Sequence, residues 1–242
     1  MEKLAKFIAY EQDHCRQTIL ECEDLELNIQ IHDYLQEHSF FPPYRPSHQL
    51  VASTYDVQKK LVTSNYCSHT CTVEVAQAIF QTGKLMSAVK VFGKSGAELV
   101  TDSRNAASDP ADYFDYIMFG WSNTSSGYRL AMERLLGRAP SEEELQEKFI
   151  PGVSFHFLYE ELIQAPGYIF DGYHVAKVRD SLDLDTFLHL CIIPSKDKAC
   201  FEGLISSQLQ DRVIYLDYEG EGLQDWNTKV NQVLHGKDKL KE

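Results

Sequence analysis

Hydrophobic and polar positions repeat at two different periods along this chain, and the changes of period mark its elements. Over residues 2–38, apolar side chains recur every three or four positions, which is typical of a helix with one buried face. The run FFPPYRP at 40–46 ends that helix, because proline lacks an amide donor and restricts the residue before it. We therefore predict a helical extension over 1–46 and a second domain over 47–242.

The helical period returns after the stretch YCSHT, which we interpret as the end of a strand. Thr72 is a residue type that begins helices, and Gly83 tolerates the left-handed conformation that ends them. A short helix is therefore predicted between these two residues, and 84–93 is expected to form a loop that leads into a strand. The apolar face of this helix is formed by Val75, Ala76, Ile79 and Phe80.

Strands are predicted where aromatic and β-branched residues alternate with others or form short continuous runs. Helices are expected between them, one ending at Gly137, one beginning at Ser141 with Glu144 at the capping-box position, and one over 223–236. Because strands and helices are mixed without regular βαβ alternation, we predict an α+β fold with a mainly antiparallel sheet. The predicted strands lie within 113–121, 153–159, 167–178, 187–194 and 212–218.

Composition and charge narrow the class of protein. The 242 residues are 43% hydrophobic and carry a net charge of −13, so we expect a soluble globular protein without a broad nucleic-acid-binding surface. No apolar run is long enough to span a membrane, and the N-terminus lacks the apolar core of a signal peptide. The six cysteines are scattered along the chain, which favours reduced thiols and a cytoplasmic location.

The stretch from Cys67 to Cys71 holds the most reactive side chains in a small space. Cys67, His69 and Cys71 occupy alternate positions, so on a strand they point to the same side. Thiolate and imidazole suit zinc, and a Cys–His pair suits nucleophilic catalysis. A buried structural histidine is the simplest alternative. A further alternative is that His69 and Thr70 orient a ligand by hydrogen bonds in one nucleotide-sized crevice.

The last alternative gains support from a resemblance. It is carried by the spacing of His69, Thr70, Ala76, Ile79, Gly83, Lys84, Leu85 and Ser87. This spacing is similar to the first motif of ADP-ribosyltransferase folds, especially the DNA-modifying and RNA 2′-phosphotransferase branches. The resemblance implies a split sheet of ADP-ribosyltransferase type, with NAD as cofactor. It also implies that His69 touches the NAD ribose and that Thr70 lines the nicotinamide cleft.

The resemblance also directs attention to polar residues further along the chain. Such families place a glutamate on a late strand, and this chain has no clear counterpart. Asp171 and His174, in the bend IFDGYH, are our candidates for the catalytic groups near the reacting carbon. For cofactor binding, the candidates are His69, Thr70, Ser87, Arg104, Asn105, Trp121, Asn123 and Arg129.

A second resemblance covers most of residues 65–195. The segments AASDPADYFDYIMFGWSN, FIPGVSFHFLYEELIQAPGYIFDGYHVAKV and LCIIP look like a bacterial family labelled phosphate ammonium lyase, a label that names no mechanism. Two functions therefore remain open. One is an NAD-dependent ADP-ribosyltransferase acting on an unknown acceptor. The other is a non-catalytic protein that binds a nucleotide-type small molecule, which the missing glutamate favours.

Overall fold

A large, mainly antiparallel sheet organises the chain. The computed structural model describes residues 64–102, 111–169 and 175–238, so the helical extension predicted over 1–46 lies outside the described residues. Neighbouring strands of the large sheet are antiparallel except for β8 and β9. In the order β5-β6-β3-β1-β4-β8-β9, its seven strands are Tyr168–Ile169, Ala176–Arg179, Tyr116–Trp121, Tyr66–Cys71, Val153–Leu158, Leu190–Pro194 and Val213–Leu216.

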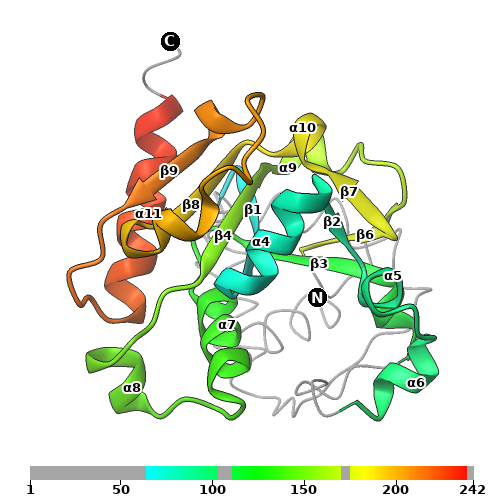
Figure 1. Cartoon of the computed structure of the whole chain (residues 1–242), viewed down its shortest axis with the longest axis horizontal. Helices are drawn as coiled ribbons and strands as arrows, with labels where there is room; N and C mark the ends of the chain where they lie inside the picture. The colour runs from blue at the N-terminus through cyan, green and yellow to red at the C-terminus, as the bar shows by residue number, and fades with distance from the viewer. Residues whose placement is uncertain (1–63, 103–110, 170–174, 239–242) are drawn as a thin grey trace, which may run out of the picture.

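A separate small sheet pairs β2 (Lys84–Met86) with β7 (Ser181–Asp183), also antiparallel. Figure 1 shows α11 beside β9 at one end of the large sheet and α5 beyond β2 at the other.

This mixed α/β arrangement, mostly antiparallel, agrees with the predicted α+β class. The helices are α4 (Val73–Thr82), α5 (Ala88–Phe92), α6 (Gly96–Val100), α7 (Ser126–Leu136), α8 (Glu142–Glu147), α9 (Tyr159–Leu162), α10 (Leu184–Phe187) and α11 (Leu223–Asp238), with 3-10 turns η2 (Ala111–Asp115), η3 (Ser195–Phe201) and η4 (Gln210–Arg212).

Several predicted helix ends are confirmed. Thr72 precedes the first residue of α4, and Gly83 follows the last one in the left-handed conformation. Ser141 and Glu144 form the predicted capping box at the start of α8, each bonded to the other's backbone amide. The prediction for 84–93 is wrong: a short strand, β2, comes first and the helix α5 follows it. The predicted strand was placed too late because the three residues of β2 show no period until they pair with β7, and the helix α5 was not predicted.

Two hydrophobic clusters pack on opposite faces of the large sheet. One face holds Cys67, Phe119 and Phe155 and is covered by α4, the small sheet, α10 and η3. We call it the α4 face. The other holds Tyr66 and Ile192 and is covered by α7, α8 and α11, and we call it the α7 face. Because helices cover both faces of β4, its first five residues are all buried.

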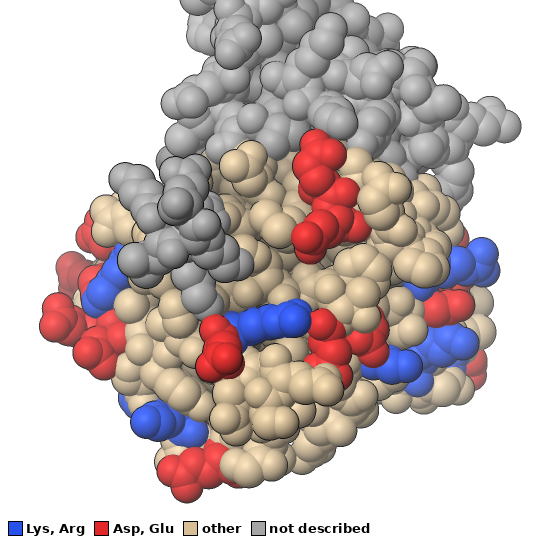
Figure 2. Space-filling model, turned by 90° about the horizontal axis from the view of Figure 1, so that it is seen from above, with Lys and Arg blue, Asp and Glu red and all other residues tan. Residues whose placement is uncertain are grey.

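The surface carries charges of both signs. On the side shown in Figure 2, acidic and basic side chains are interspersed over the described residues, without a large area of one sign. In the described part of the chain, no helix is both long and apolar enough to cross a membrane.

Candidate functional site

His69 lies in the middle of the sheet, where two central strands begin to separate. The register of β1 and β3 pairs Cys67 with Trp121 and Ser68 with Gly120. Just past the pair formed by Ser68 and Gly120, Nδ1 of His69 lies 3.3 Å from the carbonyl oxygen of Met118 on β3. An imidazole nitrogen therefore bonds to a backbone carbonyl oxygen at the point where the pairing of β1 with β3 ends.

This contact fixes the chemical state that the His69 ring presents. A carbonyl oxygen can only accept a hydrogen bond, so Nδ1 carries the proton and Nε2 keeps a lone pair. Burial lowers the pKa of His69 to about 4; the bond to Met118 opposes this shift and the charge of Arg134 adds to it. The ring is only partly exposed and lies edge-on to Phe119, with centroids 6.3 Å apart. At neutral pH, His69 is therefore an uncharged hydrogen-bond acceptor.

Thr70 does not share this environment. Successive side chains on a strand point to opposite faces, and the structure places His69 on the α4 face and Thr70 on the α7 face. The Thr70 side chain is 9% exposed and packs against the backbone of Gly127 on α7. The structure therefore does not bring the imidazole and the hydroxyl into one crevice, which corrects our expectation for this pair.

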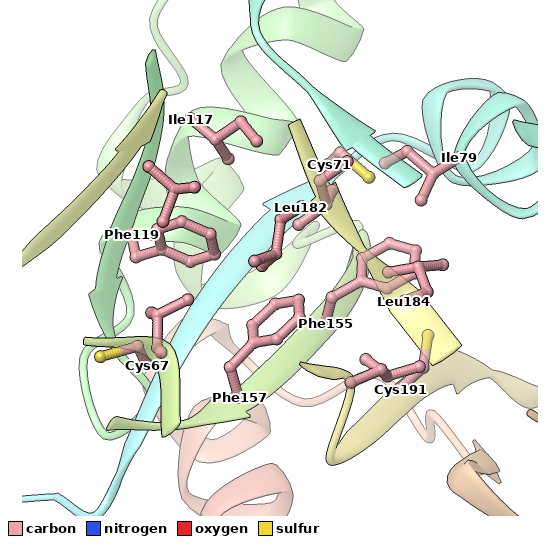
Figure 3. Close-up of a cluster of buried hydrophobic side chains, with 14 of the residues drawn as sticks. Cys67, Cys71, Ile79, Ile117, Phe119, Phe155, Phe157, Leu182, Leu184 and Cys191 are labelled. Carbon is pink, nitrogen blue, oxygen red and sulfur yellow. The ribbon is translucent and has the colours of Figure 1, made fainter. Parts of the chain in front are cut away.

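The thiols beside His69 belong to the hydrophobic core. Cys67 and Cys71 are at most 1% exposed, and Figure 3 shows them among Phe119, Phe155 and other apolar side chains. Burial raises the pKa of Cys71 to about 12 and that of Cys67 well above its usual value, so neither thiol readily forms the nucleophilic thiolate.

The same geometry argues against the zinc alternative. Four residues of strand separate the α-carbons of Cys67 and Cys71 by about 13 Å, whereas ligands of one zinc ion lie within about 2.3 Å of it. In the ranges that the structure describes, no group of three or more His, Cys, Asp or Glu side chains is placed to hold a metal ion.

Two further candidates on or near the α4 face are buried. Ser87, directly after β2, is 1% exposed, and its hydroxyl has no hydrogen-bond partner among the described residues. Its backbone amide donates to the carbonyl of Asp180, which joins the small sheet to the turn after β6. Trp121 is 1% exposed and packs on Tyr159 with ring centroids 4.9 Å apart, so its ring is occupied by core packing.

The remaining candidates lie apart from His69 or outside the described residues. Asn123 follows β3, and its carbonyl oxygen accepts a hydrogen bond from Asn227 of α11. Arg129 is on α7, with its Nε buried and without a hydrogen-bond partner among the described residues. The Asn123 bond joins the end of β3 to α11. The residues outside the described ranges are Arg104, Asn105, Asp171 and His174.

The structure also reveals a buried chain of polar groups that the sequence analysis missed. The hydroxyl of Tyr128 lies 2.7 Å from that of Ser154, which lies 2.8 Å from Nε2 of His156. Nδ1 of His156 lies 2.9 Å from the hydroxyl of Ser122. All four residues are at most 2% exposed. The available signal was the pair of polar residues, Ser154 and His156, at alternate positions within an aromatic strand.

This chain of hydrogen bonds has a structural rather than a chemical character. Burial lowers the pKa of His156 to about 3, with a smaller contribution from the charge of His189, so the ring is neutral at pH 7. Burial also raises the pKa of Tyr128 well above its usual value. Groups so far from water meet no substrate, and they join α7 to the centre of the sheet.

Comparison of the chain with protein-family models, with curated proteins and with solved structures finds no match. The geometry around His69 and the resemblance of its sequence motif are therefore the observations that bear on function.

Proposed function

We propose that this protein is an NAD-dependent ADP-ribosyltransferase-like enzyme, with His69 in its nucleotide site. The observation that carries the proposal is the neutral imidazole at the point where the β1–β3 ladder opens. Its Nε2 lone pair suits a ligand that offers a hydroxyl donor, such as a ribose. The separation of the β2–β7 sheet from the large sheet is consistent with the split sheet that the sequence resemblance implies.

The described residues fit part of such a ligand. His69 would accept a hydrogen bond from a ribose hydroxyl and, being uncharged, would not oppose positive charge on the sugar. Ser87 is a candidate by the sequence resemblance alone, because its hydroxyl is buried in this structure. NAD supplies a nicotinamide–ribose bond whose cleavage develops oxocarbenium character, as glycosidic cleavage does. Asp171 and His174 remain our candidates for stabilising that charge, and Arg104 and Asn105 for contacting phosphate.

The second candidate function is binding of a nucleotide without catalysis. It is favoured by the absence of acidic residues from β6, a late strand whose described residues are Ala176, Lys177, Val178 and Arg179. Without a carboxylate near the anomeric carbon, an oxocarbenium ion loses its main electrostatic stabilisation.

Two measurements on the purified full chain separate these functions. Incubation with NAD labelled in the ADP-ribose part should release nicotinamide and label an acceptor, with protein, nucleic acid and small-molecule acceptors tried in parallel. Thermal unfolding with NAD, ADP-ribose and other nucleotides reports binding alone, because a ligand of the native state raises the unfolding midpoint.

The variant His69→Ala should lose both signals, whereas His69→Gln should keep part of the binding because its amide oxygen accepts a hydrogen bond. Stabilisation without turnover supports the binding function. The absence of both stabilisation and turnover in the wild type would contradict the proposal in either form.

A further inference from the structure

A fully buried lysine lies in β6, the strand next to β3, and β3 carries the Met118 carbonyl that accepts the hydrogen bond from His69. Lys177 of β6 is 0% exposed, and its Nζ lies 4.4 Å from the ring centroids of both Tyr113 and Tyr116. Two aromatic rings therefore face the ammonium group, and such rings attract a cation most strongly where water is excluded.

The sheet register connects this lysine to His69. Lys177 lies directly opposite Met118 in the β3–β6 ladder. The Met118 carbonyl points the other way, towards β1, where it accepts the bond from His69. The backbone groups of Met118 thus face away from β6, which makes this a pair of the closer type, with α-carbons about 4.5 Å apart. The two side chains are in immediate contact range on the α7 face.

The two tyrosines extend this connection along the chain. Tyr113 belongs to η2 and Tyr116 begins β3, two residues before Met118. One ammonium group therefore links η2, the start of β3 and the middle of β6. This link lies beside the β3–β6 ladder, next to the position where the ladder of β3 with β1 ends.

We infer that Lys177 is a positioning residue for His69: its contacts with Tyr113 and Tyr116 hold the Met118 carbonyl where it fixes the imidazole. This inference rests on the proposed function, because it assigns His69 the ligand contact. Lys177 itself lies on the opposite face of the sheet from the His69 ring and does not touch the ligand. Its effect is on which imidazole nitrogen carries the proton.

The test uses Lys177→Met, which keeps an unbranched side chain, shortens it by one atom and removes its charge. In the ¹⁵N-labelled full chain, the imidazole nitrogens report the protonated position, and the His69 signals are identified by their loss in His69→Gln. We expect Nδ1–H alone in the wild type and a mixture of both forms in Lys177→Met. The dissociation constant for NAD should rise about tenfold, which corresponds to about 1.4 kcal/mol.

A second pair of variants keeps the test decisive if Lys177→Met does not fold. Tyr113→Leu removes one ring and keeps the ammonium, and Tyr113→Phe keeps both rings. Tyr113→Leu should give the mixed signal and Tyr113→Phe the wild-type signal. A His69 ring that stays fully Nδ1-protonated in the folded Lys177→Met or Tyr113→Leu protein would overturn the inference. If the imidazole signals respond as expected but the wild type does not bind NAD, the proposed function fails and the positioning role stands.

Discussion

Gly127 on α7 lies so close to Thr70 on β1 that a β-carbon added to it would be 2.7 Å from the Thr70 hydroxyl oxygen. This approach lets the first turn of α7 rest directly on the strand that carries His69. A helix of ordinary residues would have to stand further from the sheet, because real β-carbon contacts are not that short.

The first prediction follows from this contact. Gly127→Ala should lower the free energy of unfolding by about 1–3 kcal/mol through overpacking, despite the higher helix propensity of alanine. Gly236 on α11 is the matched control, since a β-carbon there meets nothing within 4 Å. Gly236→Ala should raise the free energy of unfolding by up to about 1 kcal/mol. Urea denaturation of both variants measures the two values. Equal effects of the two substitutions would show that the contact at Thr70 is not tight.

The second prediction concerns the buried chain of hydrogen bonds. Ser154→Ala removes its middle link and leaves the Tyr128 hydroxyl and Nε2 of His156 without their partner. Buried polar groups without partners are costly, so we expect a loss of about 2–4 kcal/mol in the free energy of unfolding. Ser181→Ala, at an exposed position of β7, should change it by less than about 0.5 kcal/mol. A loss at Ser154 as small as that at Ser181 would mean that the hydrogen bonds among Tyr128, Ser154 and His156 contribute nothing to stability.

The third prediction is a dependence of stability on pH. The pKa of His156 is about 3 in the folded protein, against about 6.5 in an unfolded chain. Between these values the unfolded state binds the additional proton, so the free energy of unfolding falls as the pH drops below about 6.5.

At about pH 4.5, His156 alone should lower the free energy of unfolding by about 2 kcal/mol relative to neutral pH. His69 acts in the same direction because burial lowers its pKa to about 4. Urea denaturation at a series of pH values measures the slope, and His156→Gln should reduce it. A wild-type stability that is flat between pH 4.5 and pH 7 would disagree with both lowered values.

A fourth prediction tests the turn between β6 and β7. Asp180 is the one described residue other than glycine with a positive φ, at 64°. Its amide donates to Asp115 and its carbonyl accepts from Ser87, so the turn ties both sheets together. Asp180→Ala should be less stable than Asp180→Gly by about 1 kcal/mol, because alanine tolerates this conformation poorly and glycine adopts it freely. Thermal unfolding of the two variants compares them directly, and an equal or higher midpoint for alanine would contradict the interpretation.

The local signals in the sequence located several elements well. Gly83 ends α4, and Ser141 with Glu144 begins α8, because capping depends on residues only a few positions apart. Thr72 stands at the start of α4 without a side-chain capping bond. Strand β2 was predicted at the wrong place because it is short and is defined only by its pairing with β7.

In the candidate site, too, the local sequence predicts some features, and others depend on pairing between strands that are distant in the sequence. The sequence indicated His69 as a group of interest, but the Met118 carbonyl and Lys177 enter only through the register of three strands. No local pattern contains that register. Interpreting YCSHT as a strand end led us to place Thr70 beside His69, whereas continuation of β1 to Cys71 turns the two side chains to opposite faces.

The central claim is that the uncharged His69 ring offers Nε2 to a nucleotide ligand. The most direct test follows the imidazole nitrogens of His69 in the ¹⁵N-labelled protein while NAD is added at pH 7. We predict that Nδ1 stays protonated and that the Nε2 signal shifts in a saturable way, as an acceptor does when it receives a hydrogen bond, with ADP-ribose producing a similar shift. A Nε2 signal that does not move at saturating NAD and ADP-ribose would contradict the account.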